Sequence, residues 1–311
     1  MALITDLYDI ASPGNLRGKA SDGFIRPTIK QFFTSTDFEE IVSYVVKGYI
    51  FSGASTATSD CDEYSAGLDT WTGKTDLIND RENSSAVSTI YQKGYLYGGS
   101  AGLSKCDEYN PDTWTSKADM PAGRGRAYLA ASTIINKGYI FGGSGSSSYV
   151  DEYVPDVWTS KTDMPAPGRY YLASSTINSK GYIYGGFIPL RADCDEYTPD
   201  TWASKTDMPG IGRRDHTATT ILSKGYIFGG YEDSGATADC IEYSPDTWTS
   251  KADLLVAVGR FAASTLDDKG YIYGGLQTSN ACNEYNSVSN SWTSKTSIPS
   301  PGRHSHSGCS I

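Results

Sequence analysis

The sequence lacks any apolar run near the roughly 20 residues that a membrane-spanning helix needs. Its first residues also lack a basic stretch followed by an apolar one, so we expect no secretory signal peptide and synthesis in the cytoplasm. No 12-residue window has the 3.6-residue apolar spacing of an amphipathic helix. These absences predict an all-β protein without membrane insertion.

Positive charge and histidine are both scarce. Lys and Arg total 26 against 36 Asp and Glu, a net charge of −10, which argues against a nucleic-acid partner. The three histidines are His216, His304 and His306. His304 and His306 share a face of a strand by period two, but no carboxylate in that strand completes a metal site. No paired Cys/His spacing for zinc exists either, so we expect no metal ion and no cofactor.

What the sequence does contain is a repeat. The phrase KGYI(F/Y)GG, or a near variant, begins six times, and six tryptophans follow at separations of 43 to 46 residues. Each copy holds four short strand candidates, for example residues 169–177, 181–186, 194–197 and 202–208. Four strands per repeat of this length, separated by turn residues, predict a six-bladed β-propeller of four-stranded blades.

The recurring residues resemble the kelch-repeat family. The marks are a glycine pair, such as Gly185-Gly186, then a tyrosine such as Tyr197 and a tryptophan such as Trp202. The first copy departs from the pattern with Ser52 in place of one glycine, and four copies have a short five-residue step from Tyr to Trp. The resemblance covers residues 41–311. It implies the propeller fold and says little about function.

Two segments compete to close the ring. Residues 302–311 align with the innermost strand of the repeat, so we predict that this C-terminal strand completes the first blade. Residues 38–46 precede the first repeat directly and are the alternative. We place an N-terminal arm at residues 1–40 and the propeller at residues 41–311. The arm's apolar residues dock either on its own propeller or on a larger assembly.

Five of the six cysteines occupy one repeat position, and Val150 takes that position in the third blade. Equivalent positions in neighbouring blades lie too far apart for a disulfide. A position that also accepts valine suits a small apolar side chain. We therefore expect structural free thiols, as in a reducing compartment.

An arginine precedes each innermost strand, close to one end of the central channel. A converging ring of guanidinium groups would bind carboxylate or phosphate. Inter-blade pairing with the one repeated glutamate per blade is the alternative. We predict no catalytic residues, because a catalytic centre needs different groups in different roles and these positions repeat. The channel arginine ring comprises Arg81, Arg126, Arg169, Arg213, Arg260 and Arg303.

Variation between the copies concentrates in the loop after the glycine pair, where binding residues commonly lie. The loop is apolar in the fourth blade and longest in the fifth. Folding of these loops over their own blades is the alternative. The candidate ligand- or partner-binding residues are Phe187, Ile188, Leu190, Arg191, Tyr231, Glu232 and Asp233.

From these patterns we predict a non-catalytic propeller that acts as a structural or protein-interaction module, with an assembly neighbour as its partner. A virion or an extracellular surface appendage is the expected kind of assembly, an expectation that rests on resemblance alone. The alternative is a propeller that binds a glycan such as sialic acid, or an epimerase-like enzyme that uses the arginine end of the channel.

Overall fold

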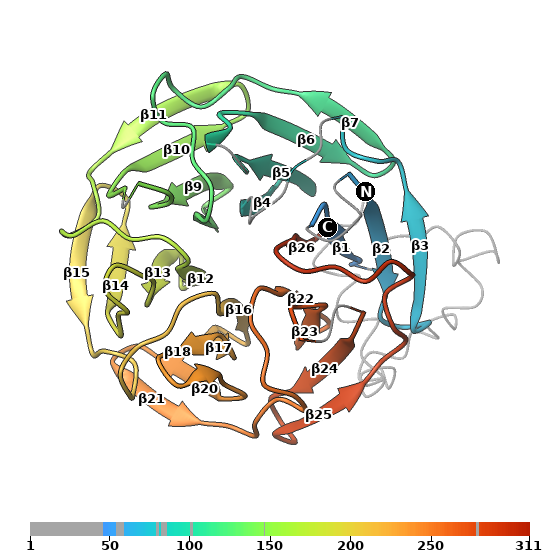
Figure 1. Cartoon of the computed structure of the whole chain (residues 1–311). Helices are drawn as coiled ribbons and strands as arrows, with labels where there is room; N and C mark the ends of the chain where they lie inside the picture. Colours follow the sequence, from blue (N-terminus) through green and yellow to red (C-terminus); the bar gives the residue numbers. More distant parts are fainter. Residues whose placement is uncertain are drawn as a thin grey trace, which may run out of the picture. The chain divides into compact units, whose positions relative to one another are not determined.

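The computed structural model describes residues 46–53, 59–78, 81, 86–99, 102–145, 147–277 and 280–311. The predicted arm, and residues 41–45 of the predicted propeller, lie outside this part. The described part contains six four-stranded antiparallel sheets around a central channel and no helix (Figure 1). The predicted all-β, six-bladed propeller is therefore confirmed.

The blades are numbered in chain order, and their strands run outward from the channel. Blade 1 consists of β26 (Ser307–Ser310), β1 (Gly48–Phe51), β2 (Cys61–Ser65) and β3 (Thr70–Lys74). Blade 2 consists of β4 (Ala86–Ile90), β5 (Lys93–Tyr97), β6 (Cys106–Asn110) and β7 (Thr113–Ser116). Blade 3 consists of β8 (Ala130–Ile134), β9 (Lys137–Phe141), β10 (Val150–Val154) and β11 (Val157–Lys161).

Blades 4 to 6 repeat this order. Blade 4 consists of β12 (Ala173–Ile177), β13 (Lys180–Tyr184), β14 (Cys194–Thr198) and β15 (Thr201–Lys205). Blade 5 consists of β16 (Thr217–Ile221), β17 (Lys224–Phe228), β20 (Cys240–Ser244) and β21 (Thr247–Ser250), with a small hairpin of β18 (Tyr231–Glu232) and β19 (Gly235–Ala236) after β17. Blade 6 consists of β22 (Ala262–Leu266), β23 (Lys269–Tyr273), β24 (Cys282–Asn286) and β25 (Ser291–Ser294).

Burial follows the place of a strand in its blade. In blade 4, the innermost strand β12 alternates between buried and half-buried residues, because one face lines the channel. The second strand, β13, is buried at four successive residues, since neighbouring blades cover both of its faces. The outermost strand β15 is mostly exposed. The apolar core therefore lies between blades.

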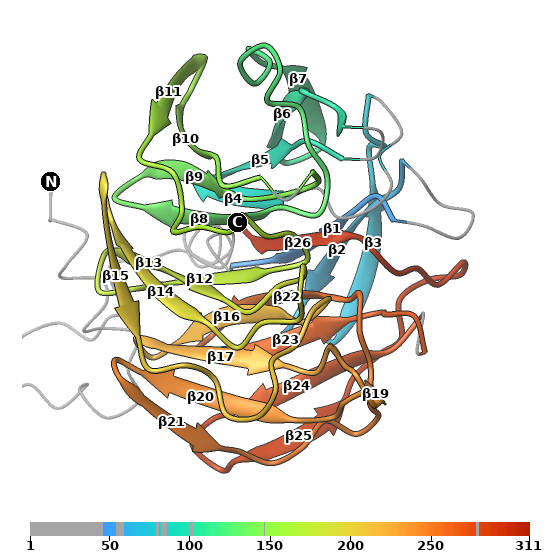
Figure 2. The ribbon, with the colours of Figure 1, turned by 60° about the vertical axis from the view of Figure 1, so that its left-hand side comes forward.

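The C-terminal strand closes the ring, as predicted. β26 pairs antiparallel with β1, with Ser307 opposite Phe51 and Ser310 opposite Gly48 (Figure 2). Lys47 and Ile311 extend the pairing through two backbone hydrogen bonds of 2.9 and 3.0 Å. Closure in this way leaves no open sheet edge at the junction.

Each outermost strand is tied to the preceding blade by its tryptophan. The indole N–H donates to a backbone carbonyl of that blade, as Trp202 does to Thr162 at 3.0 Å. The same bond recurs in all six blades, with indole donors Trp71, Trp114, Trp158, Trp202, Trp248 and Trp292. One tryptophan per blade is therefore a structural contact between blades.

The six cysteines are buried free thiols. Val150, which replaces cysteine in blade 3, is fully buried in the same position on β10. Among the described residues, no helix is long and apolar enough to cross a membrane.

Candidate functional site

The repeated arginines lie inside the blades. Five of them are at most 2% exposed, and each binds a carboxylate. Arg81 pairs with Asp107, Arg126 with Asp151, Arg169 with Asp195, Arg213 with Asp239 and Arg303 with Asp62. A buried guanidinium is tolerated because a carboxylate compensates its charge.

The alternative considered for these arginines, pairing with the repeated glutamates, is wrong, because their carboxylate partners are aspartates. In blade 4, Glu196 accepts hydrogen bonds from Tyr182 and Lys180. The aspartate next to it on the strand, Asp195, faces Arg169 instead. Adjacent strand residues point to opposite faces, which explains why one acidic residue meets the arginine and the next does not.

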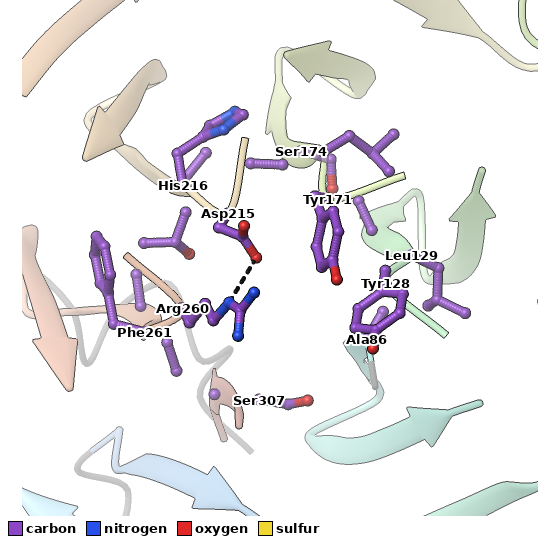
Figure 3. A pocket seen from close by; sticks show the side chains of 18 of the residues that line it. Ala86, Tyr128, Leu129, Tyr171, Ser174, Asp215, His216, Arg260, Phe261 and Ser307 are labelled. Carbon is purple, nitrogen blue, oxygen red and sulfur yellow. Dashed lines mark hydrogen bonds and ion pairs between the residues drawn. The ribbon is translucent and has the colours of Figure 1, made fainter. Parts of the chain in front are cut away.

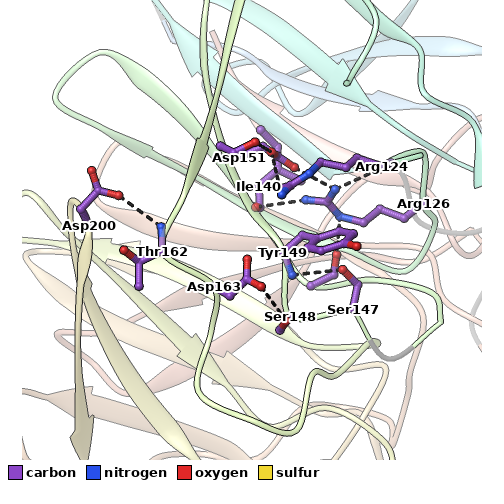
Figure 4. A network of polar contacts seen from close by, with 12 residues as sticks. Arg124, Arg126, Ile140, Ser147, Ser148, Tyr149, Asp151, Thr162, Asp163 and Asp200 are labelled. Carbon is purple, nitrogen blue, oxygen red and sulfur yellow. Dashed lines mark hydrogen bonds and ion pairs between the residues drawn. The ribbon is translucent and has the colours of Figure 1, made fainter. Parts of the chain in front are cut away.

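Figure 4 shows this arrangement in blade 3. Asp151 accepts a 2.9 Å bond from Arg126 and a 2.8 Å bond from Arg124. Arg126 also donates through Nε to the carbonyl of Gly142. Arg124 lies over the exposed ring of Tyr149, 4.1 Å from its centroid. These guanidinium groups hold the connection before β8 against β9 and β10.

Arg260 differs from the other five. In blade 6 the residue four positions before the innermost strand is Val258, which is 2% exposed and takes the place of Arg126, Arg169 and Arg213. The strand position that holds Asp195 in blade 4 holds Asn283 in blade 6. Both charges of the pair are thus missing together, and Arg260 lies two residues further along.

Arg260 belongs instead to a set of five residues that we call the rim: each lies two residues before an innermost strand. All five have left-handed backbone, with φ between 54° and 60°. They are Tyr128, Tyr171, Asp215, Arg260 and Ser305. Glycine adopts this conformation at least cost, whereas bulky side chains adopt it rarely. The rim residues therefore carry a conformational cost that glycine would not.

Backbone hydrogen bonds join the rim residues from blade to blade. The amide of Tyr171 donates to Tyr128, and that of Asp215 donates to Tyr171, at 3.0 and 3.1 Å. The amide of Arg260 donates to Asp215 at 2.9 Å, and that of Ser305 donates to Arg260 at 2.7 Å. Because these amides are occupied, recognition at the rim depends on the side chains.

All five rim residues line a cavity of about 150 Å³ at the mouth of the channel. Figure 3 shows Tyr128 and Tyr171 on one side of it, facing Asp215 and Arg260 on the other. A second cavity of about 330 Å³ follows below, lined by serine and threonine side chains of the innermost strands. Small residues such as Ala131 and Ala218 line both cavities, so the two cavities adjoin along the channel.

The charged side chains at the rim and next to it meet at Asp215. Its side chain is 2% exposed and accepts bonds from Arg214 at 2.6 Å and from Arg260 at 3.3 Å. Burial raises the pKa of Asp215, and the two guanidinium groups oppose that shift. Only Nε of Arg260 meets Asp215, so its two terminal nitrogens have no partner among the described residues. They form a forked donor beside the cavity.

Two of the three histidines lie behind the rim. Burial lowers the pKa of both His216 and His306 to about 3, with Arg213 and Arg303 respectively adding to the effect. Both rings are therefore neutral at physiological pH. His304 is half-buried, its ring nitrogen lies 3.1 Å from Ser305 Oγ, and burial next to Arg260 lowers its pKa. No three His, Cys, Asp or Glu side chains of the described part gather as a metal site.

The predicted loop residues separate into two groups. Phe187 and Tyr231 lie beside the rim, with the guanidinium of Arg214 5.1 and 5.5 Å from their ring centroids. The remaining loop residues lie farther out: Ile188 is 45% exposed, Leu190 is half-buried, Arg191 binds Asp193, Glu232 lies 3.8 Å from Arg213, and Asp233 is exposed. Their binding role stays a prediction.

Sequence reasoning did not find Tyr128, Tyr171 or Asp215. The signal for them is a difference at one position of otherwise similar repeats: Tyr, Tyr, Asp, Arg and Ser occupy equivalent places. Alignment of the copies on the innermost strand exposes this difference. Alignment on the Gly-Arg dipeptide hides it, because in blade 6 that dipeptide is displaced by two residues.

No protein-family model matches the chain, and no curated protein matches it. Solved structures do share its fold. One, titled "Structure of YjhT", has a TM-score of 0.63 and 16% sequence identity, over 73% of this chain and 87% of that chain. This likeness shows the propeller fold alone, and the resemblance to the kelch family stays a prediction.

Proposed function

We propose that this propeller is a non-catalytic binding module that holds a carbohydrate with a carboxylate group at the rim. The observation that carries the proposal is the chemistry of the five equivalent rim positions. Two tyrosines face an aspartate and an arginine across one cavity, although all six blades share the same four-stranded plan (Figure 3). Such convergence of different polar and aromatic groups is typical of small-molecule sites.

The rim residues suit the two surfaces of a sugar. The rings of Tyr128 and Tyr171 lie 4.3 Å apart between centroids and offer apolar faces to the C–H side of a pyranose. The terminal nitrogens of Arg260 offer a fork that matches a carboxylate in a bidentate pair. Asp215 accepts hydrogen bonds, as sugar hydroxyls require of a partner.

Binding is favoured over catalysis by the titratable groups. A general acid or base works best with a pKa near the working pH. The pKa of His216 and His306 is about 3, because burial disfavours the charged rings. Asp215 is engaged by two guanidinium groups. Neither histidine is therefore poised to exchange a proton with a ligand at neutral pH.

The test is calorimetric titration of the full chain with N-acetylneuraminic acid, galacturonic acid and galactose. We expect the two acidic sugars to bind about tenfold more tightly than galactose, a difference that Arg260→Gln removes. Arg124→Gln is the matched control, since Arg124 lies on a loop of the same kind outside the cavity. Failure of all three sugars to bind the unmodified chain would overturn the proposal.

A second candidate is the predicted protein-interaction module in a larger assembly. It is supported by large apolar side chains that are about half exposed on connections flanking the rim: Ile188, Ile211, Leu255, Val256 and Leu276. Exposed large apolar groups favour a protein contact. Light scattering on the full chain, on a variant with Ile211→Asp and Leu255→Asp, and on a chain lacking residues 1–36 tests this candidate. Equal masses and equal partner binding for all three would count against it.

A further inference from the structure

The loops after the glycine pairs of blades 4 and 5 place an aromatic side chain beside the rim. Phe187 donates its amide to the carbonyl of Tyr170 at 2.8 Å. Tyr231 and Arg214 exchange two backbone bonds of 2.8 and 3.0 Å. The same loop position holds Ser144 in blade 3 and Leu276 in blade 6. Among the described loops, aromatic rings therefore occur here only in two adjacent blades.

One guanidinium lies among these rings. Arg214 is 5.1 Å from the centroid of Phe187, 5.5 Å from that of Tyr231 and 5.9 Å from that of the rim residue Tyr171. One of its nitrogens binds Asp215, which leaves its other donors without a hydrogen-bond partner among the described residues. Its side chain is 32% exposed. We call Phe187, Arg214 and Tyr231 the outer platform.

The ring of Tyr231 is fixed in place on two sides. A Cβ atom on Gly259 would lie 2.3 Å from this ring, so only glycine allows the contact. The hydroxyl of Tyr231 accepts a 2.5 Å hydrogen bond from Gln277, whose carbonyl oxygen accepts the amide of Gly259 at 3.3 Å. A ring held in this way loses little conformational entropy when a ligand binds.

The outer platform is continuous with the rim through Arg214, which contacts both Asp215 and Tyr171. We propose that it is a second sugar subsite, so that the ligand of this protein is an acidic oligosaccharide and not a single sugar. A guanidinium with free donors between two aromatic rings offers both apolar faces and hydrogen bonds to the next sugar unit. This inference rests on the proposed binding function of the rim.

Other extended ligands fit the platform less well. A nucleic acid would also stack on aromatic rings, but its affinity comes mainly from many Lys and Arg contacts to phosphates, and the rim and platform offer only the guanidinium groups of Arg214 and Arg260. An acidic peptide has no flat apolar face in its backbone for the rings. An acidic oligosaccharide combines carboxylates for Arg214 and Arg260 with C–H faces for Phe187 and Tyr231.

The test compares galacturonic acid with its linear tetramer by calorimetric titration of the full chain. Four identical units give about a fourfold gain for statistical reasons alone. We expect the tetramer to bind the unmodified chain about fortyfold more tightly than the monomer does. Tyr231→Ala and Phe187→Ala should each weaken tetramer binding by about tenfold. Both substitutions should change the affinity for the monomer less than about twofold. Tyr231→Phe keeps the ring and is expected to keep most of the gain. Tyr149→Ala, an exposed aromatic of blade 3, is the matched control.

The outcomes separate the two proposals. A tetramer that gains no more than the statistical factor, while monomer binding still depends on Arg260, overturns the outer subsite and leaves the rim proposal intact. Equal losses for monomer and tetramer in Tyr231→Ala, with unchanged thermal unfolding, also overturn it, because the ring then belongs to the rim site. If an acidic hexapeptide binds at the platform and the tetramer does not, the ligand class is wrong.

Discussion

Asp215 Oδ1 accepts a hydrogen bond from Arg260 Nε at 3.3 Å, across the junction between blades 5 and 6. The bond fixes the orientation of the Arg260 guanidinium, and the negative charge of Asp215 partly neutralises the positive charge of that group. Asp215 thus orients Arg260 and also opposes the binding of an anion.

We expect Asp215→Asn to tighten the binding of galacturonic acid by about tenfold, because the amide keeps the size of the side chain and removes its negative charge. Calorimetric titration measures the change, and Ser305→Ala, a substitution on the same rim, should change affinity less than about twofold. Weaker binding in Asp215→Asn would show that orientation of Arg260 outweighs electrostatic competition.

Blade 6 has uncharged residues in place of the buried ion pair of blade 4 and so shows which substitutions could remove that pair. It carries Val258 and Asn283 where blade 4 carries Arg169 and Asp195. Asp195→Asn alone leaves the buried guanidinium of Arg169 with only the more distant carboxylate of Asp193, at 3.6 Å, and should lower the free energy of unfolding by about 3 kcal/mol.

The double variant Arg169→Val, Asp195→Asn reproduces the blade 6 pair and should recover more than half of that loss. Urea denaturation of the two single variants and the double variant forms a double-mutant cycle. Additive losses would contradict the expectation, because they would mean that the two side chains do not compensate each other.

Buried His216 and His306 predict a dependence of stability on pH. Their pKa is about 3 in the folded chain and about 6.5 in an unfolded chain, so between these values only the unfolded chain binds the protons. Stability therefore falls as pH decreases from 6.5, by about 1.4 kcal/mol per pH unit for each histidine.

Phe261 occupies the equivalent position in blade 6, which makes His306→Phe the substitution of choice. Urea denaturation at pH 7, 6 and 5 should give a shallower loss of stability for His306→Phe than for the unmodified chain. Parallel pH profiles would refute the assignment of this dependence to His306.

The turns between the first and second strands carry apolar residues in left-handed backbone. Ile135 has φ 47° and is 69% exposed, and Leu222 has φ 48° and is 53% exposed. Blade 4 has Asn178 at this position, a residue that such turns prefer. Ile135→Asn should raise the free energy of unfolding by about 1 kcal/mol, and Asn178→Ile should lower it by a similar amount. Thermal unfolding of the two variants measures both changes in stability. A loss of stability in Ile135→Asn would contradict the prediction.

The fold follows from the sequence because short-range signals recur six times. Glycine pairs, turn residues and one tryptophan per copy identify the blades, and the likeness of residues 302–311 to the innermost strand identifies the closing strand. These features are local in the chain and need no knowledge of packing.

The candidate site can be predicted from the sequence only in part. Phe187 and Tyr231 stand out as aromatic residues in variable loops, and both lie beside the cavity. In four blades the partner of the buried arginine depends on which face of the third strand an acidic residue occupies, and Asp195 and Glu196 differ in that respect by one residue. In blade 5 the partner is Asp239, which precedes the third strand. The role of Arg260 depends on a two-residue displacement in blade 6, which becomes visible only when the backbone places Val258 in the arginine position.

The closing strand also determines the order in which the molecule can be completed. Arg303, next to β26, contacts Ser52 in blade 1 although 251 residues separate them. A chain emerging from the ribosome forms the contacts of blades 2 to 6 in succession, whereas blade 1 lacks its innermost strand until every other blade has been synthesised. Contacts so distant in sequence form slowly. Until then the described part of the chain offers β1 no partner on that side, and an unpaired strand edge favours association with other chains.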